Sequence, residues 1–445
     1  MSTRRGRRLA PIVAVAGALA LTACSPGSSG GGGGGTDDEG VTTVTFRLWD
    51  EAAAAAYEES FAAFTEQHPE IRVEIEQVPW ANYWEQLPLD LQAGEMADIF
   101  WTNTSNFGRY ADAGNLLDIT EVLGEDHDEW NPAAVELYER NGSLWGVPQL
   151  SDSIALLYNK TLLDEAGIDP TTLAWSPNPD EDTLLPALQQ LTTDSAGVTA
   201  AEEGFDPDDV AVWGFNAQND LQAIWLDFLA QNGGVFQDGD SYAFSSPEGV
   251  EAFTYLVDLI NTHHVAPPAA DTNANGDLSR ELFVQGKLAL FQTGQYSLPF
   301  TADIGDSFEW GVAPMIAGPE GRIGVVHAVA ALGNADTEHP DEVAEVLRWI
   351  GSAEGQSFLA ESGAAFPAAV EAQQTFTDYW NEQGVDTTPF LEQAAGPSVS
   401  APLGPNSNAG LEALGGYFPD MFAGLIPVAD ALAQAQDAAN EAIAE

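Results

Sequence analysis

The strongest constraint on the fold is a regular alternation of strand-like and helix-like hydrophobic patterns. Residues 44–48 and 71–75 place apolar side chains at every second position, which is the period of a half-buried strand. Between them, apolar residues at 57–64 recur at the spacing of one helix face. A second helical pattern at 84–91 and a short apolar strand at 98–101 follow. This β-α-β-α-β order predicts an α/β fold with a mostly parallel sheet flanked by helices.

The rest of the chain extends this α/β pattern with more helix. Helical apolar spacing recurs at 253–260 and 343–350, and the segments 288–291 and 324–332 are apolar enough to be buried strands. An Ala-rich closing helix is predicted at 428–445. A chain of 445 residues is too long for one compact domain, so we expect two to three domains or two lobes.

The first forty residues resemble an export and anchoring segment. A basic start is followed by an apolar stretch at 9–20, which is too short to span a bilayer and predicts a secretory signal peptide over 1–23. Leu21-Thr22-Ala23-Cys24 resembles a bacterial lipobox, in which Cys24 becomes the lipid-carrying first residue. The Gly/Ser-rich segment 24–40 is predicted to be a flexible tether. Export by the general or the twin-arginine route stays open.

The charge balance excludes one class of partner and favours one class of ligand. The chain has 13 Lys and Arg against 69 Asp and Glu, and removal of the signal peptide leaves nine against 69, a net charge of −60. Such a surface repels phosphate backbones, so we expect no nucleic-acid partner. Anionic ligands need Arg or Lys, which are scarce, so a neutral sugar or polyol is favoured while cationic ligands stay possible.

No catalytic motif holds up in the sequence. A nucleophile elbow, a zinc-protease helix, a phosphate-binding loop after a strand and a Cys-x-x-Cys pair are all missing. Asp271 to Asp277 matches the first seven positions of a calcium loop, but Leu282 stands where the bidentate acid is due. The alternative for this segment is a turn that caps the next helix. We therefore expect a protein that is not an enzyme and that needs no cofactor or metal.

Several ordered segments resemble extracellular solute-binding proteins of bacterial ABC importers, of the maltodextrin-binding type. The resemblance covers almost all of 42–425 and rests on the order and spacing of individually weak pieces. These pieces are Thr45-Phe46-Arg47-Leu48-Trp49, Ala97-Asp98-Ile99-Phe100, Leu144-Trp145-Gly146-Val147-Pro148, Leu156-Leu157-Tyr158-Asn159-Lys160, Phe283 to Phe291 with Gly294-Gln295-Tyr296, Trp310 to Pro314, and Ser352 to Gln356. Many sugar-binding members carry Trp where this chain has Tyr296.

The resemblance implies a two-lobed periplasmic-binding-protein-like fold with a hinge and a ligand cleft between the lobes. By analogy, lobe 1 comprises 41–152 and 292–326, and lobe 2 comprises 153–291 and 327–445. Closure about the hinge would trap the ligand. The implied partners are a small-molecule ligand and the permease subunits of an ABC importer. The implied state is a monomer held by its lipid on the extracellular face of the cell membrane.

Candidate ligand-binding residues follow strands or lobe crossings, where ligands bind open α/β sheets. Aromatic rings can cover the apolar face of a sugar, while Asp, Asn and Gln bind hydroxyl groups. For each candidate the alternative is a helix cap, a core residue or a surface residue. The candidates are Trp49, Asp50, Tyr83, Asn103, Asp152, Trp225, Gln295, Tyr296, His327 and Phe366.

Two classes of function remain open from the sequence. The first is a binding lipoprotein that captures a sugar or oligosaccharide, or alternatively a peptide, polyamine or polyol, for a permease. The second is a secreted carbohydrate-active enzyme on a similar scaffold, because a pair of catalytic carboxylates cannot be picked out among so many acids.

Overall fold

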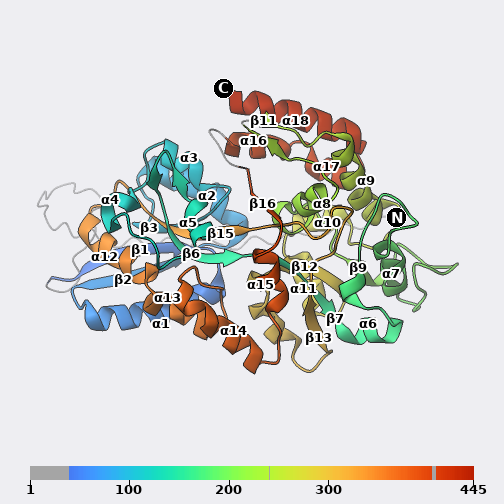
Figure 1. The fold of residues 1–445 in the computed structure, drawn as a ribbon, viewed down its shortest axis with the longest axis horizontal. Helices are drawn as coiled ribbons and strands as arrows, with labels where there is room; N and C mark the ends of the chain where they lie inside the picture. Colours follow the sequence, from blue (N-terminus) through green and yellow to red (C-terminus); the bar gives the residue numbers. More distant parts are fainter. Residues whose placement is uncertain (1–39, 240, 403–406, 445) are drawn as a thin grey trace, which may run out of the picture. The chain divides into compact units, whose positions relative to one another are not determined.

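The computed structural model describes residues 40–239, 241–402 and 407–444, which contain two five-stranded sheets. The first sheet has the order β2 (Ile71–Gln77), β1 (Thr42–Leu48), β3 (Ile99–Asn103), β15 (His327–Gly333) and β6 (Val147–Asp152). Strand β1 runs parallel to β2 and β3, whereas β15 is antiparallel to β3 and β6. We call the part of the chain around this sheet lobe 1 (Figure 1).

The second sheet defines lobe 2. Its order is β13 (Trp310–Ala313), β7 (Ile154–Asn159), β12 (Leu288–Gly294), β9 (Val210–Phe215) and β8 (Thr193–Asp194). Only β12 and β9 pair in parallel, and the other pairs are antiparallel. The prediction of a mostly parallel sheet is therefore right only for β1, β2 and β3. The antiparallel strands come from distant parts of the chain.

Helices pack against each sheet and complete two separate cores. The core of lobe 1 includes side chains from α1 (Glu51–Gln67), α2 (Trp80–Ala93), α3 (Phe107–Asp112), α4 (Ile119–Leu123), α5 (Pro132–Glu136), α12 (Pro340–Gly351) and α13 (Ala353–Glu361). The core of lobe 2 includes side chains from α6 (Lys160–Ala166), α7 (Leu184–Leu191), α8 (Leu226–Gln231), α9 (Pro247–Asn261), α10 (Ala269–Ala274), α16 (Ser407–Leu414), α17 (Phe418–Phe422) and α18 (Val428–Ala444).

Three further helices contribute to a third cluster beside β7 and β12. They are α11 (Leu278–Val284), α14 (Gln373–Glu382) and α15 (Thr388–Ala394). The remaining described strands are short pairs: β4 (Glu139–Arg140) with β5 (Ser143–Leu144), β10 (Gln237–Asp238) with β11 (Ser241–Tyr242), and β14 (Gly324–Val325) with β16 (Ser398–Val399).

The local predictions of helix and strand are confirmed where the apolar spacing is regular. The strands predicted at 44–48, 71–75 and 98–101 are β1, β2 and β3, and the helices predicted between them are α1 and α2. Helix α9 begins after Ser246, whose hydroxyl accepts a hydrogen bond from the Gly249 amide, as an N-cap does. The closing helix is α18.

The division of the chain between the lobes differs from the predicted one. Strand β12 lies between β7 and β9 in the second sheet, and β13 pairs with β7, so residues 292–313 belong with lobe 2. The chain returns to lobe 1 only between β14 and β15, and residues 327–372 pack in the lobe 1 core. The pairing partners of a buried strand are non-local, and the local pattern does not reveal them.

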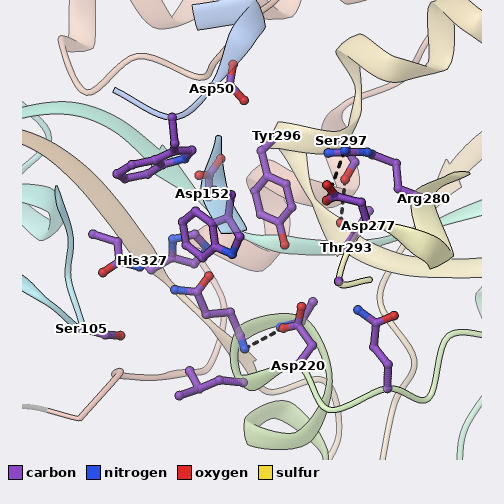
Figure 2. A pocket seen from close by; sticks show the side chains of 18 of the residues that line it. Asp50, Ser105, Asp152, Asp220, Asp277, Arg280, Thr293, Tyr296, Ser297 and His327 are labelled. Carbon is purple, nitrogen blue, oxygen red and sulfur yellow. Dashed lines mark hydrogen bonds and ion pairs between the residues drawn. The ribbon is translucent and has the colours of Figure 1, made fainter. Parts of the chain in front are cut away.

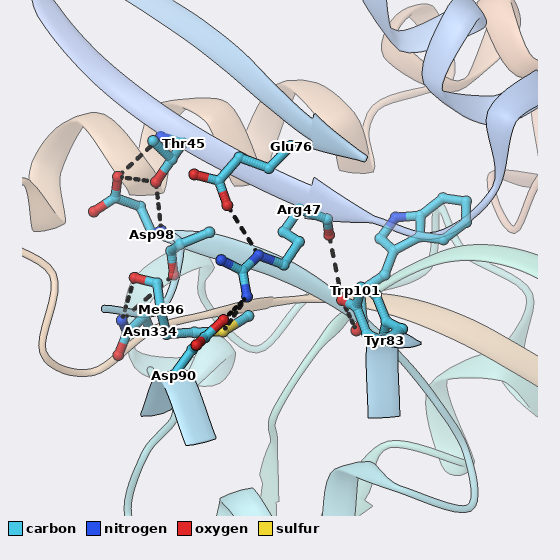
Figure 3. Close-up of polar contacts among 10 residues, drawn as sticks. Thr45, Arg47, Glu76, Tyr83, Asp90, Met96, Asp98, Trp101 and Asn334 are labelled. Carbon is cyan, nitrogen blue, oxygen red and sulfur yellow. Dashed lines mark hydrogen bonds and ion pairs between the residues drawn. The ribbon is translucent and has the colours of Figure 1, made fainter. Parts of the chain in front are cut away.

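A buried arginine links three elements of lobe 1 (Figure 3). The Arg47 Nε donates to Glu76 Oε2 at 2.9 Å, and its Nη1 donates to Asp90 Oδ2 at 2.5 Å. This pairing links β1 to β2 and α2, because the three residues come from those elements. Arg47 is only 9% exposed, so its guanidinium needs such partners, since an unpaired buried charge is strongly destabilising.

Among the described residues, no helix has the length and apolar character needed to cross a membrane. The predicted signal peptide, the lipobox with Cys24 and nearly all of the predicted tether lie outside the described residues.

Candidate functional site: a cavity between the two lobes

A cavity of about 650 Å³ is lined by residues from both lobes. Lobe 1 contributes the ends of β1, β3, β6 and β15, and lobe 2 contributes the segment after β9, the end of β12, α11 and α16. Figure 2 shows several of its polar side chains, including Asp50, Asp152 and His327 of lobe 1 and Asp220 and Tyr296 of lobe 2. The volume lies in the range of sites for small organic molecules.

A cluster of aromatic rings forms one wall of this cavity. The Trp49 ring lies 5.1–5.3 Å, centroid to centroid, from the rings of Trp80, Tyr83, Trp84 and Trp101. Of these, Trp49, Trp80 and Trp101 line the cavity, and Trp80 is 47% exposed. Trp101 is only 1% exposed, so Trp80 supplies most of the exposed ring surface, and the contacts of Trp49 with Trp80 and Trp101 are edge-to-face.

Behind this wall, Tyr83 fixes the aromatic cluster to the sheet. Its hydroxyl donates to the Trp101 carbonyl oxygen at 2.7 Å, and it also lies 3.5 Å from the Arg47 carbonyl oxygen (Figure 3). Tyr83 is only 1% exposed and does not line the cavity. Burial raises the pKa of its phenol well above the usual value, so the hydroxyl keeps its proton.

Two carboxylates of lobe 1 face the cavity. Asp50 is the N-cap of α1 and accepts a hydrogen bond from the Ala53 amide at 2.7 Å. Asp152 ends β6, is 3% exposed and has no hydrogen-bond partner among the described residues. Burial, followed by the nearby charge of Asp50, raises the pKa of Asp152 to about 8. Burial also raises the pKa of Asp50, although its backbone hydrogen bond opposes this effect.

Lobe 2 supplies polar groups of both signs. Asp220 caps the helical turn Leu221–Trp225 through bonds from the Gln222 and Ala223 amides at 2.9 and 2.8 Å. Arg280 lies 3.8 Å from the centroid of the Phe300 ring and forms an ion pair of 3.1 Å with Asp277. Arg280 is the sole Arg or Lys among the described cavity-lining residues, which also include five carboxylic acids.

Helix α16 connects lobe 2 to lobe 1 beside the cavity. Glu412 forms an ion pair with Arg109 of α3, and the Asn408 Nδ2 donates to Asn106 Oδ1 at 3.1 Å and to the Ser105 carbonyl oxygen. Leu411, Glu412 and Leu414 of the same helix line the cavity. These contacts join residues about 300 positions apart in the sequence.

The structure brings seven of the ten candidate residues together around this cavity. They are Trp49, Asp50, Asn103, Asp152, Trp225, Tyr296 and His327. The helix-cap alternative also holds for Asp50, and the core alternative for Trp225, which is 3% exposed. Their role in binding a ligand stays a prediction.

Three candidates lie outside the lining of the cavity. Tyr83 supports the aromatic wall as described. The Gln295 side-chain oxygen accepts a hydrogen bond from the Ser153 amide at 2.7 Å, so it holds the crossing from β6 to β7. Phe366 is buried against Phe376, with 5.5 Å between ring centroids, and its carbonyl oxygen accepts from the Ser151 amide. These three residues stabilise the surroundings of the cavity.

Sequence reasoning missed most of the lining supplied by lobe 2. The run Asn216 to Asp220 directly follows β9, a position that the same rule would have singled out had that strand been recognised. Trp80 begins a helix, and Arg280 lies within one, so neither position carried a local signal. The cavity-lining face of α16 is adjacent to the site only through tertiary contacts.

The calcium-loop alternative is not supported by the backbone. Asp271 to Ala274 belong to α10, where side chains two positions apart point in different directions, so Asp271 and Asn273 do not converge. The Asn275 side-chain oxygen accepts from the Asp277 amide at 3.1 Å, as the turn alternative requires. Within the described ranges, no group of three or more His, Cys, Asp or Glu side chains is arranged to hold a metal ion.

Comparison with known proteins identifies the class of protein that this fold and cavity define. The family model described as "Bacterial extracellular solute-binding protein" matches residues 49–357. The chain belongs to this family of bacterial extracellular solute-binding proteins. Several relatives of the chain are named as binding proteins.

Solved structures and characterised relatives agree with this assignment. The crystal structure of UspC from Mycobacterium tuberculosis is 50% identical, with a TM-score of 0.69, over 90% of this chain and 100% of that one. The ABC substrate-binding protein Lmo0181 from Listeria monocytogenes, in complex with cycloalternan, is 24% identical, with a TM-score of 0.76, over 90% and 98%. The arabinooligosaccharide-binding protein of Bacillus subtilis is 23% identical over 51% of this chain and 49% of its own.

Proposed function

We propose that this protein is an extracellular receptor that captures a sugar or oligosaccharide in the cavity between its lobes and delivers it to an ABC importer. The observation that carries the proposal is the combination of an aromatic wall, of which Trp80 is exposed, with buried carboxylate and amide groups around one cavity. Indole faces can cover the C–H face of a pyranose, and Asp and Asn side chains can bind its hydroxyl groups.

Further support comes from the chemistry that the cavity lacks and from its relatives. Arg280, the one guanidinium among the described lining residues, is already paired with Asp277 and packed on Phe300, which leaves little for an anionic ligand. Relatives are named for binding arabinooligosaccharides, maltodextrin and diacetylchitobiose. A neutral saccharide fits both observations.

A binding panel tests the proposal directly. Purified protein beginning at residue 41 is titrated calorimetrically with maltotriose, arabinotriose, mannobiose and diacetylchitobiose, and the mixtures are then analysed for products. Saturable binding without turnover is the expected result. Turnover would instead establish a carbohydrate-active enzyme, and the absence of binding to every saccharide would refute the sugar assignment.

The proposed capture mechanism is closure of the two lobes around the ligand. The cavity takes its lining from both lobes, so a ligand that contacts both walls favours the closed arrangement. Three connections join the lobes, at Asp152–Ile154, at Val325–His327 and through the segment that carries α14 and α15. Solution scattering of the monomer should give a smaller radius of gyration with saturating saccharide, whereas an unchanged radius would argue against closure.

A cationic solute such as a polyamine is the second candidate. The observation that favours it is the presence of five carboxylic acids and one guanidinium in the described lining. Spermidine added to the same titrations separates the two candidates, because a polyamine receptor binds it in preference to every saccharide.

We further propose that the mature protein is held at the extracellular face of the membrane by a lipid on Cys24. The proposal rests on the lipobox and the tether in the sequence. Replacement of Cys24 by Ser should release the protein into the medium, because a covalent lipid would be its anchor. A Cys24→Ser variant that stays in the membrane fraction after a high-salt wash would refute the anchor.

A further inference from the structure

Three polar side chains of lobe 1, which we call the unpaired row, line the cavity without hydrogen-bond partners among the described residues. Its members are Asp152 of β6, His327 of β15 and Ser105, which lies in the turn after β3. They are 3%, 4% and 7% exposed, and all three line the cavity. Among the described residues, neither ring nitrogen of His327, the Ser105 hydroxyl nor the Asp152 carboxyl has a hydrogen-bond partner.

The sheet itself brings these three side chains together. Asp152 and His327 are directly opposite each other in the antiparallel pair of β6 and β15, so their side chains lie on the same face of the sheet. Near the start of β15, Thr104 bonds to Ala328, the neighbour of His327, through three contacts of 3.1, 3.2 and 3.3 Å. This pairing holds Ser105 beside the beginning of β15, and Figure 2 shows Ser105 and His327 on the same side of the cavity.

Unpaired polar groups in such a buried position destabilise the empty protein. The two ring nitrogens of His327 and the Ser105 hydroxyl are shielded from water, and the protein returns no hydrogen bond in exchange. Another polar residue of the same cavity, Asn216, is fully paired, because its side chain bonds to both backbone groups of Gln292 at 2.9 Å. Outside the lining, buried atoms of Trp84, Thr102 and Thr387 also lack a partner among the described residues. Unpaired groups that line a cavity can be completed by a ligand in it, whereas a group outside the lining, such as the Thr387 hydroxyl, cannot.

We infer that this row is a subsite for an uncharged sugar edge that carries adjacent hydroxyl groups. A neutral imidazole has one N–H donor and one acceptor nitrogen, and the Ser105 hydroxyl also donates and accepts. A hydroxyl group can satisfy both kinds of partner, whereas an ammonium group has no acceptor for the His327 N–H. Burial lowers the pKa of His327 to about 4, which agrees with a neutral ring at neutral pH. This inference rests on the proposed sugar-binding function. It adds that Asp152, His327 and Ser105 select the arrangement of hydroxyl groups on the sugar.

The groups around His327 do not supply an alternative partner. Asp152 faces it from β6, and the Tyr296 ring of lobe 2 lies 6.2 Å away, centroid to centroid. The next position facing the cavity along β15 is Val329, which is apolar. The only titratable neighbours of His327 among these elements are therefore Asp152 and Tyr296, and the structure gives neither a hydrogen bond to it.

The test compares affinity with stability in matched variants. His327→Phe keeps a planar ring but removes both nitrogens, His327→Gln keeps one donor and one acceptor, and Ser105→Ala removes the hydroxyl. Thr387→Val is the control, because the Thr387 hydroxyl is also buried without a partner but lies outside the cavity lining. Each variant is melted without ligand and titrated with whichever of maltotriose, arabinotriose, mannobiose and diacetylchitobiose binds the unmodified protein most tightly.

A recognition subsite predicts opposite effects on affinity and stability. His327→Phe and Ser105→Ala should each weaken saccharide binding at least tenfold while leaving the melting temperature of the empty protein equal or higher. His327→Gln should recover part of the affinity, and Thr387→Val should leave affinity unchanged. A site that hydrogen-bonds a ligand hydroxyl rejects partners that cannot form the bond.

The outcomes separate this inference from the proposed function. Unchanged saccharide affinity in His327→Phe, or equal affinities for the Phe and Gln variants, overturns the subsite while the receptor assignment stands. If no saccharide binds the unmodified protein, the sugar assignment fails, and the subsite, which depends on it, fails too. A lower melting temperature of empty His327→Phe also overturns the subsite, because the imidazole would then stabilise the fold.

Discussion

The replacement of Gly294 by Ala should weaken ligand binding by moving a neighbouring aromatic ring. Gly294 ends β12, and a Cβ atom at this position would lie 2.2, 2.6 and 3.0 Å from Cε1, Cδ1 and Cζ of Tyr296. An ordinary carbon contact begins near 3.4 Å, so the edge of the ring must move by about 1.2 Å. The Gly294 backbone has φ −89° and ψ 173°, which alanine adopts without strain, so the ring contact is the main effect.

The size of the effect follows from where the Tyr296 ring can go. The ring lines the cavity, so it can swing into the space that the ligand occupies. The cost of overpacking is about 1–3 kcal/mol in closed cores. Here we expect that cost to appear in binding, as a loss of roughly tenfold to a hundredfold in affinity. The empty protein should melt within about 2 °C of the unmodified one, because the cavity relieves the clash.

Gly276→Ala is the matched control for this prediction. Gly276 also lines the cavity, but a Cβ atom there would meet nothing within 4 Å. Calorimetric titration with the best-binding saccharide of the panel and thermal melting of the empty proteins measure both quantities. Equal affinities for the Gly294→Ala variant and the unmodified protein, or equal losses in the two glycine variants, would refute the argument from the Tyr296 contact.

Three further predictions concern pH and lobe contacts. His327 has a pKa of about 4 in the folded state and an ordinary pKa of 6.5, so at pH 5 only the unfolded state binds the proton. Urea unfolding should therefore show that the unmodified protein loses about 2 kcal/mol of stability between pH 7.5 and 5 relative to His327→Phe. Parallel pH profiles of the two proteins would contradict this prediction. The pKa of Asp152 is raised to about 8 in the folded state, so the folded state keeps this proton at pH values where the unfolded state has lost it, and stability falls as pH rises from 4 towards 8. The stability of Asp152→Asn relative to the unmodified protein should therefore be greater at pH 9 than at pH 5. The same stability difference at both pH values would count against the raised pKa. The double variant Arg109→Ala with Asn408→Ala removes the Arg109–Glu412 and Asn408–Asn106 contacts between the lobes. The radius of gyration of the empty variant in solution scattering should be larger than that of the unmodified protein. An unchanged radius would show that these contacts do not hold the lobes together.

The sequence was most informative where one local pattern determines one element. The period of two in β1 and β2 and the helical spacing of Tyr57, Phe61 and Phe64 predicted elements that the structure contains. The same local logic placed Trp49 and Asp50 at the end of β1, where they line the cavity. Such predictions succeed because a strand or helix with one buried face must repeat its apolar side chains at the period of the backbone.

The predicted site was incomplete because several cavity residues have no local signature. Trp80 and Arg280 lie on helices whose apolar spacing says nothing about what their other faces meet. Gln295 follows the expected strand, yet its side chain bonds to the Ser153 amide at 2.7 Å and supports the crossing between lobes. A residue at the end of a strand can face the cavity or its support, and only the packing of the neighbouring chain decides between them.

By itself, the sequence determined the α/β class, the secondary structure of the regular segments and the strongly acidic composition, because each of these depends on residue type or short-range spacing. The lipobox around Cys24 stays a prediction. The tertiary structure decided which sheet contains β12 and β15, and therefore where the chain returns to lobe 1. It also decided that Asp152, His327 and Ser105 form one unpaired row and that α16 faces α3. These features depend on contacts between residues as many as 303 positions apart, and pairing over such distances is selected by the energy of the whole fold.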